Sequence, residues 1–180
     1  MKRIVITGPE SSGKTTLAAD LAAHFGVPWV REMARSYLEA RQRIEGSSGY
    51  QEEDLLRIAR LQLETGDRAE ALISPDALPL LVIDTDLITI RIWGEEKYGR
   101  SDPWIVERTE QRPYDFWLLC APDMPWEADP LRENPHDRDR LFEVYERTLL
   151  KLGKPYVVLG GTQVERLRRA VGHVEVLVHV

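Results

Sequence analysis

The sequence predicts an α/β protein in which helices cover both faces of a parallel β-sheet. Three observations lead to this fold class. Apolar, strand-like runs alternate with amphipathic, helix-like runs along the whole chain. A glycine-rich loop, Gly8–Thr15, lies between the first such strand and the first such helix. The run Leu78–Ile83 is mainly apolar, which is typical of a strand buried on both faces of a parallel sheet.

The first elements surround the glycine-rich loop. Lys2–Thr7 is a predicted strand because it contains the β-branched run Ile4–Ile6. Lys14–Phe25 is a predicted helix, since its apolar residues recur at spacings of three and four, and Gly26 ends it. The next predicted elements are a short strand over Val27–Val30, a helix over Arg31–Arg43, a surface loop over Ile44–Gly49 and a long helix over Tyr50–Leu72.

The alternation continues to the C-terminus. The strand Leu78–Ile83 follows Pro75, and the apolar run Tyr114–Cys120 predicts a second central strand. Between them, helices are predicted over Asp86–Tyr98 and Pro103–Gln111. Ala121–Asp137 is proline-rich and irregular. The last predicted elements are a helix over Arg138–Leu152, a strand over Pro155–Leu159, a helix over Thr162–Val171 and a closing strand over Val174–Val180.

Size and composition describe an ordinary globular protein. The 180 residues, 43% of them hydrophobic and 30% charged, predict a single domain over 1–180. A net charge of −6 argues against a nucleic-acid or anionic-membrane surface. The strand after Met1–Arg3 is too short for a signal-peptide core, and no apolar run approaches the roughly 20 residues of a membrane span. We therefore expect a cytoplasmic protein.

The loop Gly8–Thr15 matches the phosphate-loop pattern G-x-x-x-x-G-K-[ST] in full. Gly8 and Gly13 permit backbone conformations that turn successive N–H groups toward an anion, and the following helix adds its positive end. Lys14 is expected to reach the β- and γ-phosphates of ATP, and the Thr15 hydroxyl to ligate Mg²⁺. The alternative is a Gly/Ser-rich turn that matches by accident. The predicted nucleotide contacts are Gly8, Glu10, Ser11, Ser12, Gly13, Lys14, Thr15 and Thr16.

Two acidic residues, Asp84 and Asp86, follow the strand Leu78–Ile83. An acidic residue at the end of a buried strand beside a phosphate loop usually binds Mg²⁺ together with the loop hydroxyl. The alternative is a helix N-cap, in which the carboxylate accepts N–H groups of the next helix. One cap explains only one of the two residues. We therefore expect Asp84 to hold the metal, and we place Asp86 among the substrate contacts.

The second strand ends next to Glu32, with Arg35 and Tyr37 beyond it. In a doubly wound sheet this edge lies beside the γ-phosphate, where an acceptor would bind. Glu32 could take the proton from an acceptor hydroxyl, and Arg35 shares its helical face. A solvated Glu–Arg pair is the alternative. Tyr37 and Tyr50 are candidates for a wall around a flat ring, although aromatic residues also build cores.

The irregular segment after the strand Tyr114–Cys120 carries Trp126, Arg132 and Arg138. Arginine forks match phosphate oxygens and stabilise charge in the transition state, so these residues predict a lid at approximately 121–140. A mixed-charge solvated loop is the alternative. It leaves Trp126 unexplained, and we expect Trp126 to form a wall of the ligand pocket.

Two further features have structural interpretations. Cys120 lies in an apolar run and is expected to be a buried small hydrophobe rather than a nucleophile. Arg166, Arg168 and Arg169 are interpreted as a solvated face of the last helix or as counterparts to acidic neighbours.

Four segments together resemble the ribosylnicotinamide kinase domain of the NadR-type NAD-biosynthesis proteins. These are the phosphate loop Gly8–Thr15, Glu32–Glu39, Ile83–Leu87 and Trp126–Arg132. The resemblance implies a P-loop kinase fold and ATP- and Mg²⁺-dependent phosphorylation of the 5′-hydroxyl of nicotinamide riboside, giving nicotinamide mononucleotide. It also marks Asp129, in the Trp-x-x-Asp-x-Leu-Arg segment, as a substrate contact.

The sequence departs from this family in two respects. Met33 stands where an aromatic residue is common, so the surface that stacks on nicotinamide is expected to differ. The DNA-binding and nucleotidyltransferase domains of the full-length bacterial regulators are not expected in this chain.

Other functions stay open from the residues alone. A nucleotide-dependent regulatory ATPase or GTPase is one, although a GTPase would be expected to show an N-K-x-D segment, and the chain has none. A kinase of another nucleoside or nucleotide is the nearer alternative. Glu32, Asp84 and Asp86 all remain candidates for the general base, and a homo-oligomer is neither predicted nor excluded.

Overall fold

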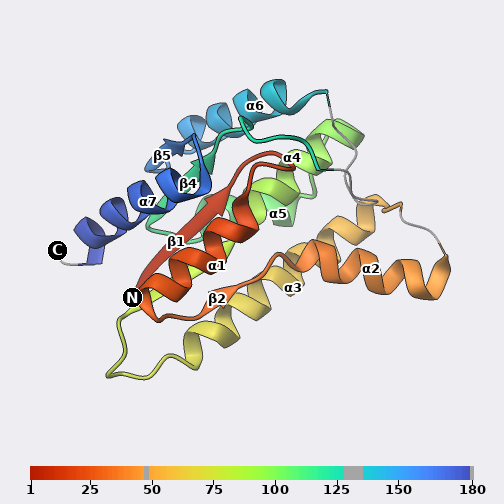
Figure 1. Ribbon diagram of the computed structural model, residues 1–180. Coiled ribbons are helices and arrows are strands. Elements are labelled where there is room, and N and C mark those ends of the chain that lie inside the picture. The colour runs from red at the N-terminus through yellow and green to blue at the C-terminus, as the bar shows by residue number, and fades with distance from the viewer. Residues whose placement is uncertain (47–48, 128–135, 179–180) are drawn as a thin grey trace.

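The computed structural model describes residues 1–46, 49–127 and 136–178 (Figure 1). Its strands are β1 (Lys2–Thr7), β2 (Trp29–Val30), β3 (Leu80–Asp84), β4 (Phe116–Cys120) and β5 (Tyr156–Leu159). Its helices are α1 (Lys14–Phe25), α2 (Met33–Glu45), α3 (Glu52–Ala71), α4 (Leu87–Tyr98), α5 (Pro103–Gln111), α6 (Arg138–Lys151) and α7 (Gln163–Val178). All strand pairs are parallel, in the order β2-β3-β1-β4-β5, so the predicted α/β class is confirmed.

The strand order brings the chemically important loops together. β1 is the central strand, with Ile6 in register with Asp84 of β3 on one side and with Leu118 of β4 on the other. Because the strands are parallel, the carboxyl ends of β3 and β4 lie beside the loop that follows β1. The phosphate loop therefore has the acidic end of β3 and the segment after β4 as its neighbours.

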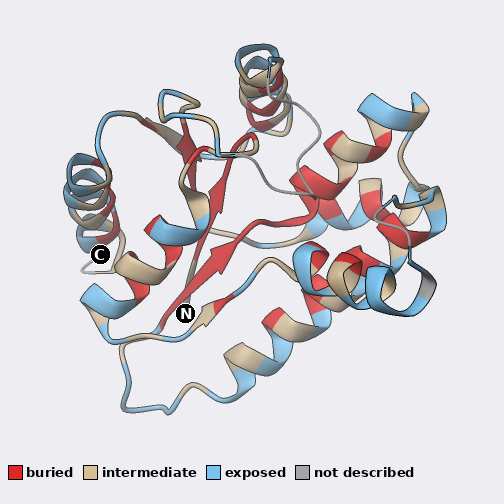
Figure 2. Ribbon diagram, turned by 45° about the vertical axis from the view of Figure 1, so that its right-hand side comes forward, coloured by how far each residue is buried: buried red, intermediate tan, exposed pale blue. Residues whose placement is uncertain are grey.

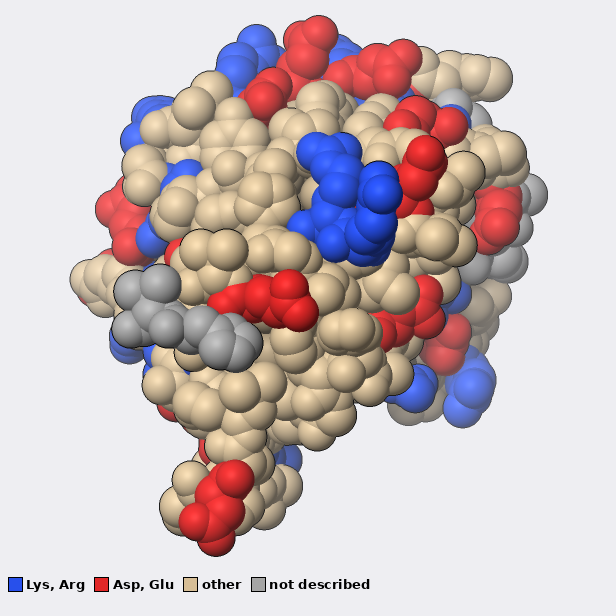
Figure 3. Space-filling model, turned by 60° about the vertical axis from the view of Figure 1, so that its left-hand side comes forward, with Lys and Arg blue, Asp and Glu red and all other residues tan. Residues whose placement is uncertain are grey.

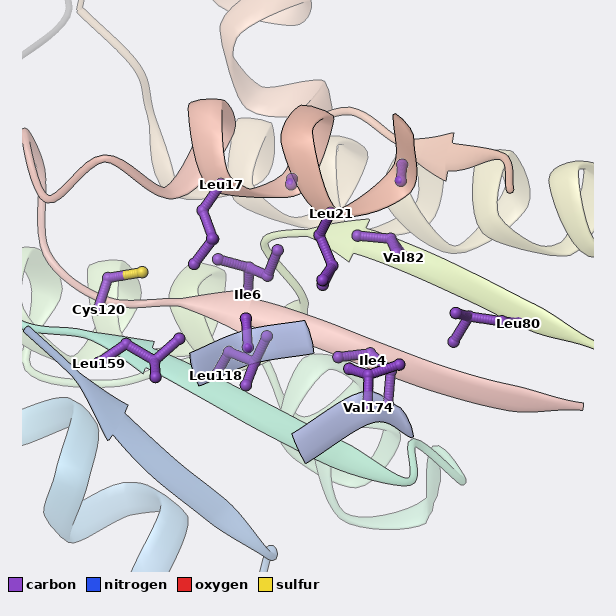
Figure 4. Packing of buried hydrophobic residues seen from close by; sticks show 13 residues of the cluster. Ile4, Ile6, Leu17, Leu21, Leu80, Val82, Leu118, Cys120, Leu159 and Val174 are labelled. Carbon is purple, nitrogen blue, oxygen red and sulfur yellow. The ribbon is translucent and has the colours of Figure 1, made fainter. Parts of the chain in front are cut away.

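The core consists of two layers on opposite faces of the sheet. Ile4 and Ile6 of β1 face α1 and α7, and they pack among Leu17, Leu21 and Val174 (Figure 4). Val5 points to the opposite face, in a second cluster with residues of α4 and α6. This is the alternation expected of a strand covered on both faces. Figure 2 shows the consequence: β1, β3 and β4 are buried along most of their length, the edge strands β2 and β5 are less buried, and the helices are buried on their inner sides.

A third cluster joins α2, α3, α4 and α5 beside the main sheet. Ala34 of α2, Ile58 of α3, Ile90 of α4 and Ile105 of α5 are all buried in it. In Figure 1, α2 and α3 lie side by side at the β2 edge. This packing fixes the direction of α2, which starts immediately after Glu32.

The predicted closing strand Val174–Val180 is wrong as far as Val178. The chain remains helical there, because α7 extends from Gln163 to Val178. Val174 is fully buried in the core together with Ala170, one turn earlier. The β-branched residues of this run favour a strand, but Ala170 and Val174 can both face the sheet only when the segment is helical. Residues 179–180 lie outside the described residues.

The described surface carries both signs of charge. The face in Figure 3 has one compact group of basic side chains with acidic side chains around it. Among the described helices, none is both long enough and apolar enough to cross a bilayer.

Candidate active site

The phosphate loop takes a backbone course that two of its residues can follow only as glycines. Gly8 has a φ of 139°, and a Cβ there would lie 2.6 Å from the carbonyl oxygen of Cys120. Gly13 has a φ of 77°, and a Cβ there would lie 2.7 Å from the sulfur of Met124. The positive φ strains any other residue at both positions. At Gly8 a Cβ would also collide with backbone, whereas at Gly13 it would meet the movable end of the Met124 side chain. The glycine roles predicted from the sequence therefore have a steric basis.

Polar side chains of the loop fold back onto its own backbone. The Ser12 hydroxyl and the Lys14 ammonium each donate a hydrogen bond to the Pro9 carbonyl, both at 2.7 Å. Ser11 holds a φ of 53°, in the left-handed region. Internal contacts therefore shape the loop, and Pro9 is the partner that holds the Lys14 ammonium in this structure.

One pocket joins the loop to α2, α4, α6 and the segment after β4. It contains all the predicted nucleotide contacts from Gly8 to Thr16, together with Glu32 and Arg35. Seven further lining residues were not predicted from the sequence: Leu38, Thr89, Trp93, Met124, Pro125, Glu127 and Tyr145. They come from separate segments that only the fold brings together. The sequence signals among them are the aromatic ring of Trp93, which could bind a flat ligand, and the position of Met124, Pro125 and Glu127 within the predicted lid.

Glu32 contributes a carboxylate to this pocket. It occupies the N-cap position of α2, but its side chain makes no capping hydrogen bond. The surrounding protein raises the pKa of this carboxyl by desolvation; Lys14 opposes the shift and the Asp84 carboxylate adds to it. A carboxylate with a raised pKa is a stronger base, which suits proton abstraction. Arg35 lines the same pocket and forms an ion pair with Glu39 at 3.7 Å.

Asp84 is the last residue of β3, is fully buried and does not itself line the pocket. In the described chain neither of its carboxyl oxygens has a partner in hydrogen-bond geometry. Burial raises the pKa of the Asp84 carboxyl, while the nearby Thr15 hydroxyl and Lys14 ammonium oppose this shift. A buried acid with no internal partner is costly unless a cation or ordered water satisfies it. Thr15 and Asp84 therefore offer oxygen ligands suited to Mg²⁺.

Asp86 has a structural task. Its Oδ1 accepts a hydrogen bond from the Ile88 N–H at 3.2 Å, which caps α4, and its Oδ2 accepts one from Trp117 Nε1 at 3.0 Å. Burial raises the pKa of this carboxyl to about 6. Asp86 does not line the pocket. Asp86 is therefore the helix N-cap that the sequence offered as an alternative, and both of its carboxyl oxygens accept hydrogen bonds from within the protein.

The two predicted aromatic contacts, Tyr37 and Tyr50, also lie outside the pocket lining. The Tyr37 hydroxyl donates to Asp54 at 2.7 Å and ties α2 to α3. Tyr50 stacks on Trp93 with 5.9 Å between the ring centroids, and the Lys97 ammonium lies 3.6 Å from the Tyr50 centroid. Tyr37 therefore joins two helices, and Tyr50 contacts the pocket residue Trp93 without lining the pocket itself.

Arg138 connects the predicted lid to the phosphate loop. Its Nη1 donates to the Ser11 carbonyl at 3.2 Å and to the Met124 carbonyl at 2.8 Å, and its guanidinium lies 5.8 Å from the Trp126 ring centroid. Trp126 does not line the pocket, although Pro125 and Glu127 do. The predicted lid and substrate residues Arg132 and Asp129 lie outside the described residues.

Arg166 differs most from its sequence interpretation. It is fully buried, so the solvated face expected for it is wrong, whereas the alternative, a counterpart to an acidic neighbour, describes its ion pair with Asp123. Its guanidinium donates to the carbonyls of Ser12 at 2.7 Å, Gly161 at 2.9 Å and Ala121 at 3.0 Å, and forms an ion pair with Asp123. Arg168 and Arg169 are exposed, as expected. A run of three arginines on one helix does not reveal which one faces inward.

The geometry of the loop and its neighbours agrees with comparisons to known proteins. A family profile described as an AAA domain matches residues 3–166. The chain belongs to this AAA domain family. This AAA domain is 28% identical over 155 residues to the trifunctional NAD biosynthesis/regulator protein NadR of Salmonella typhimurium, covering 86% of the chain and 36% of that protein. For NadR of Escherichia coli the identity is 29% over 141 residues, covering 78% and 33%. The chain spans about a third of the length of these curated relatives.

Solved structures show the same fold. A NadR protein in complex with NR has a TM-score of 0.76 at 23% identity, over 99% of this AAA domain and 52% of that chain. A NadR protein in complex with NAD and AMP-PNP has a TM-score of 0.78 at 24% identity, over 99% and 50%. Deoxyadenosine kinase from M. mycoides with bound dCTP has a TM-score of 0.63 at 10% identity, over 96% and 98%. The P-loop kinase fold expected from the sequence is confirmed.

Proposed function

We propose that this chain is an ATP-dependent kinase that phosphorylates the 5′-hydroxyl of nicotinamide riboside, giving nicotinamide mononucleotide. One observation carries the choice of transfer over hydrolysis: a single pocket is lined by the phosphate loop, by Glu32 between β2 and α2, and by Arg35 in the first turn of α2. Such a pocket can hold a triphosphate and an acceptor hydroxyl side by side.

Glu32 is the residue we assign as general base. Its carboxylate lines the pocket, it is not used as a helix cap, and its pKa is raised by enclosure. It would accept the proton of the 5′-hydroxyl as that oxygen bonds to the γ-phosphorus and the bond to the leaving ADP breaks. The other two acidic candidates have different surroundings, since both Asp86 oxygens accept hydrogen bonds inside the protein, and Asp84 is fully buried and does not line the pocket.

Lys14 and the metal ligands would neutralise the phosphates. Lys14 lines the pocket and needs only to leave the Pro9 carbonyl to reach a bound phosphate. Thr15 and Asp84 would hold Mg²⁺, which neutralises phosphate charge when it is bound. The described residues contain no group of three or more His, Cys, Asp or Glu side chains arranged for a metal. Phosphate oxygens and water would therefore supply the other ligands.

The choice of acceptor rests on similarity. The relatives that match most of the chain are NadR proteins, and one solved NadR structure is a complex with NR. The four sequence segments that resemble the ribosylnicotinamide kinase domain support the same choice. We further propose that residues 1–180 act as one cytoplasmic kinase domain with a lid near 121–140.

A coupled ADP-release assay against a panel of nucleosides tests this proposal. Nicotinamide riboside should give the highest kcat/KM, and water alone should give almost no ADP. A deoxynucleoside that outperforms nicotinamide riboside would instead identify a deoxynucleoside kinase. That second candidate is favoured by the deoxyadenosine kinase likeness, which covers 98% of that enzyme. Rapid ADP release with no acceptor would indicate an ATPase.

A further inference from the structure

The buried guanidinium of Arg166 holds three separate segments around the phosphate loop. Its three carbonyl partners belong to the loop (Ser12), to the segment after β4 (Ala121) and to the turn between β5 and α7 (Gly161). Asp123 balances its charge and also accepts a hydrogen bond from the Gly161 N–H at 2.7 Å. A planar fork with five N–H donors can satisfy all of these acceptors at once, which an ammonium cannot.

The contact with Ser12 has a consequence for the next N–H group along the chain. Among the described residues every peptide bond is trans. The C=O of Ser12 and the N–H of Gly13 belong to one planar trans unit, so they point in opposite directions. Arg166 Nη1 holds that carbonyl at 2.7 Å. The Gly13 N–H is therefore directed away from Arg166, where α1 begins and where an anion would bind.

Arg138 makes a comparable contact one peptide earlier, at the Ser11 carbonyl. The two arginines thus hold consecutive carbonyls of the loop from α6 and α7. Their surroundings differ, because Arg138 is only partly buried, whereas Arg166 is fully buried and paired with Asp123. Arg138 can leave its carbonyl at little desolvation cost, but Arg166 cannot.

We propose that Arg166 is a positioning residue for triphosphate binding, which fixes the Ser12–Gly13 peptide with its N–H directed at the phosphates. A free peptide at a glycine can rotate among several conformations, and ordering it on binding costs affinity. Arg166 removes this cost by holding the peptide in place before nucleotide arrives. The inference rests on the nucleotide half of the proposed function and is independent of the identity of the acceptor.

Arg166→Lys tests the proposal, because it retains the charge beside Asp123 but replaces the fork with a single ammonium. Arg168→Lys is the matched control, since Arg168 is exposed on the same helix. Binding of Mg²⁺–AMP-PNP and binding of nicotinamide riboside alone are each measured by calorimetry, with the thermal midpoint as the check of folding. We expect Arg166→Lys to weaken AMP-PNP binding about tenfold or more, the scale of losing hydrogen bonds to a charged donor. Its affinity for nicotinamide riboside should stay within about twofold of the parent, and Arg168→Lys should change neither affinity.

The two affinities separate this inference from the proposed function. Failure of the parent to bind nicotinamide riboside would count against the acceptor assignment, and the AMP-PNP measurement would still decide the role of Arg166. A folded Arg166→Lys protein that binds AMP-PNP as tightly as the parent overturns the proposal.

A measurement on the unmodified protein covers the case in which Arg166→Lys does not fold. The Arg166 Nε–H should exchange with solvent far more slowly than that of Arg168, with and without tripolyphosphate. The backbone amide resonance of Gly13 should shift strongly when tripolyphosphate is added. An Arg166 Nε–H that exchanges as fast as that of Arg168, or a Gly13 amide that does not respond, overturns the proposal.

Discussion

The side-chain oxygen of Gln62 accepts a hydrogen bond from the backbone N–H of Met33 at 2.8 Å. The amide nitrogen of the same side chain donates to the carbonyl of Arg31 at 3.3 Å. Gln62 is only 3% exposed, so neither contact competes with bulk water. A residue of α3 therefore holds the peptide groups on both sides of Glu32. This fixes where the backbone of the assigned base leaves β2 and enters α2.

Gln62→Leu should lower turnover more than it lowers affinity for AMP-PNP, because Glu32 loses its backbone support while the phosphate loop keeps its own. The free energy of unfolding should fall by about 1–3 kcal/mol, the cost of leaving buried backbone groups unpaired. Steady-state kinetics, calorimetry and urea unfolding measure these effects. Thr109→Val is a suitable control, since it removes a buried hydroxyl that donates to the Ile105 carbonyl of its own helix. Equal turnover in the two variants would contradict a role for Gln62 in placing Glu32.

Lys14→Ala should reduce turnover by about 10²–10³, the usual effect of removing one transition-state donor. The fold should persist, because the hydrogen bond of the Lys14 ammonium among the described residues goes to the Pro9 carbonyl of the same loop. Lys151→Ala, at an exposed position on α6, should behave like the parent. Turnover above about a tenth of the parent value would remove Lys14 from phosphate stabilisation.

Glu32→Gln and Asp84→Asn should separate the base from the metal ligand. Glu32→Gln removes the proton acceptor at constant size, so it should lower kcat far more than acceptor binding. Asp84→Asn should raise the Mg²⁺ concentration needed for half-maximal rate. Asp84→Asn should also leave the thermal midpoint equal to or above that of the parent, because the buried Asp84 carboxylate has no hydrogen-bond partner among the described residues. If Asp84→Asn leaves the Mg²⁺ requirement unchanged and Glu32→Gln changes it, then Glu32 is the metal ligand and Asp84 is the base.

Arg138→Ala should cost turnover more than AMP-PNP affinity if Arg138 leaves the Ser11 carbonyl and contacts phosphate during transfer. Arg140→Ala is the matched control on the same helix, because Arg140 forms exposed ion pairs with Asp137 and Glu96. Exposed ion pairs contribute about 0–1 kcal/mol to stability, so Arg140→Ala should leave turnover and AMP-PNP affinity almost unchanged. A loss of AMP-PNP affinity equal to the loss of turnover in Arg138→Ala would show that Arg138 acts through Ser11 instead.

Cys120 should resist alkylation in the native protein. Burial raises the pKa of its thiol to about 11, so the reactive thiolate is scarce at pH 8. Iodoacetamide labelling followed by mass spectrometry should be slow for the folded chain and rapid in denaturant. Rapid native labelling at pH 8 would mean that the end of β4 opens readily to solvent.

The local order of residues was sufficient for the parts of this protein that depend on neighbours in the chain. A β-branched strand, a glycine-rich loop and an amphipathic helix follow one another at the N-terminus, and the structure has β1, the phosphate loop and α1 in those places. The position of Asp84 at the end of an apolar strand follows from the same reasoning, since parallel strands bring their carboxyl ends to one edge. In these segments the backbone conformation and the strand periodicity depend on neighbouring residues, so the sequence alone determined them.

Tertiary packing decided the rest. The strand order, the inward orientation of Arg166, the capping role of Asp86 and the contribution of Thr89 and Tyr145 to the pocket all depend on contacts between distant segments. Val174 shows the same limit, because its β-branched surroundings favour a strand but its burial beside Ala170 keeps it helical. Secondary-structure preferences and single charges are worth about 1 kcal/mol or less per residue, whereas a fully buried apolar side chain contributes about 1.5–3 kcal/mol. Where local preference and burial favour different structures, burial contributes the larger free energy. Which side chains are buried depends on the tertiary structure.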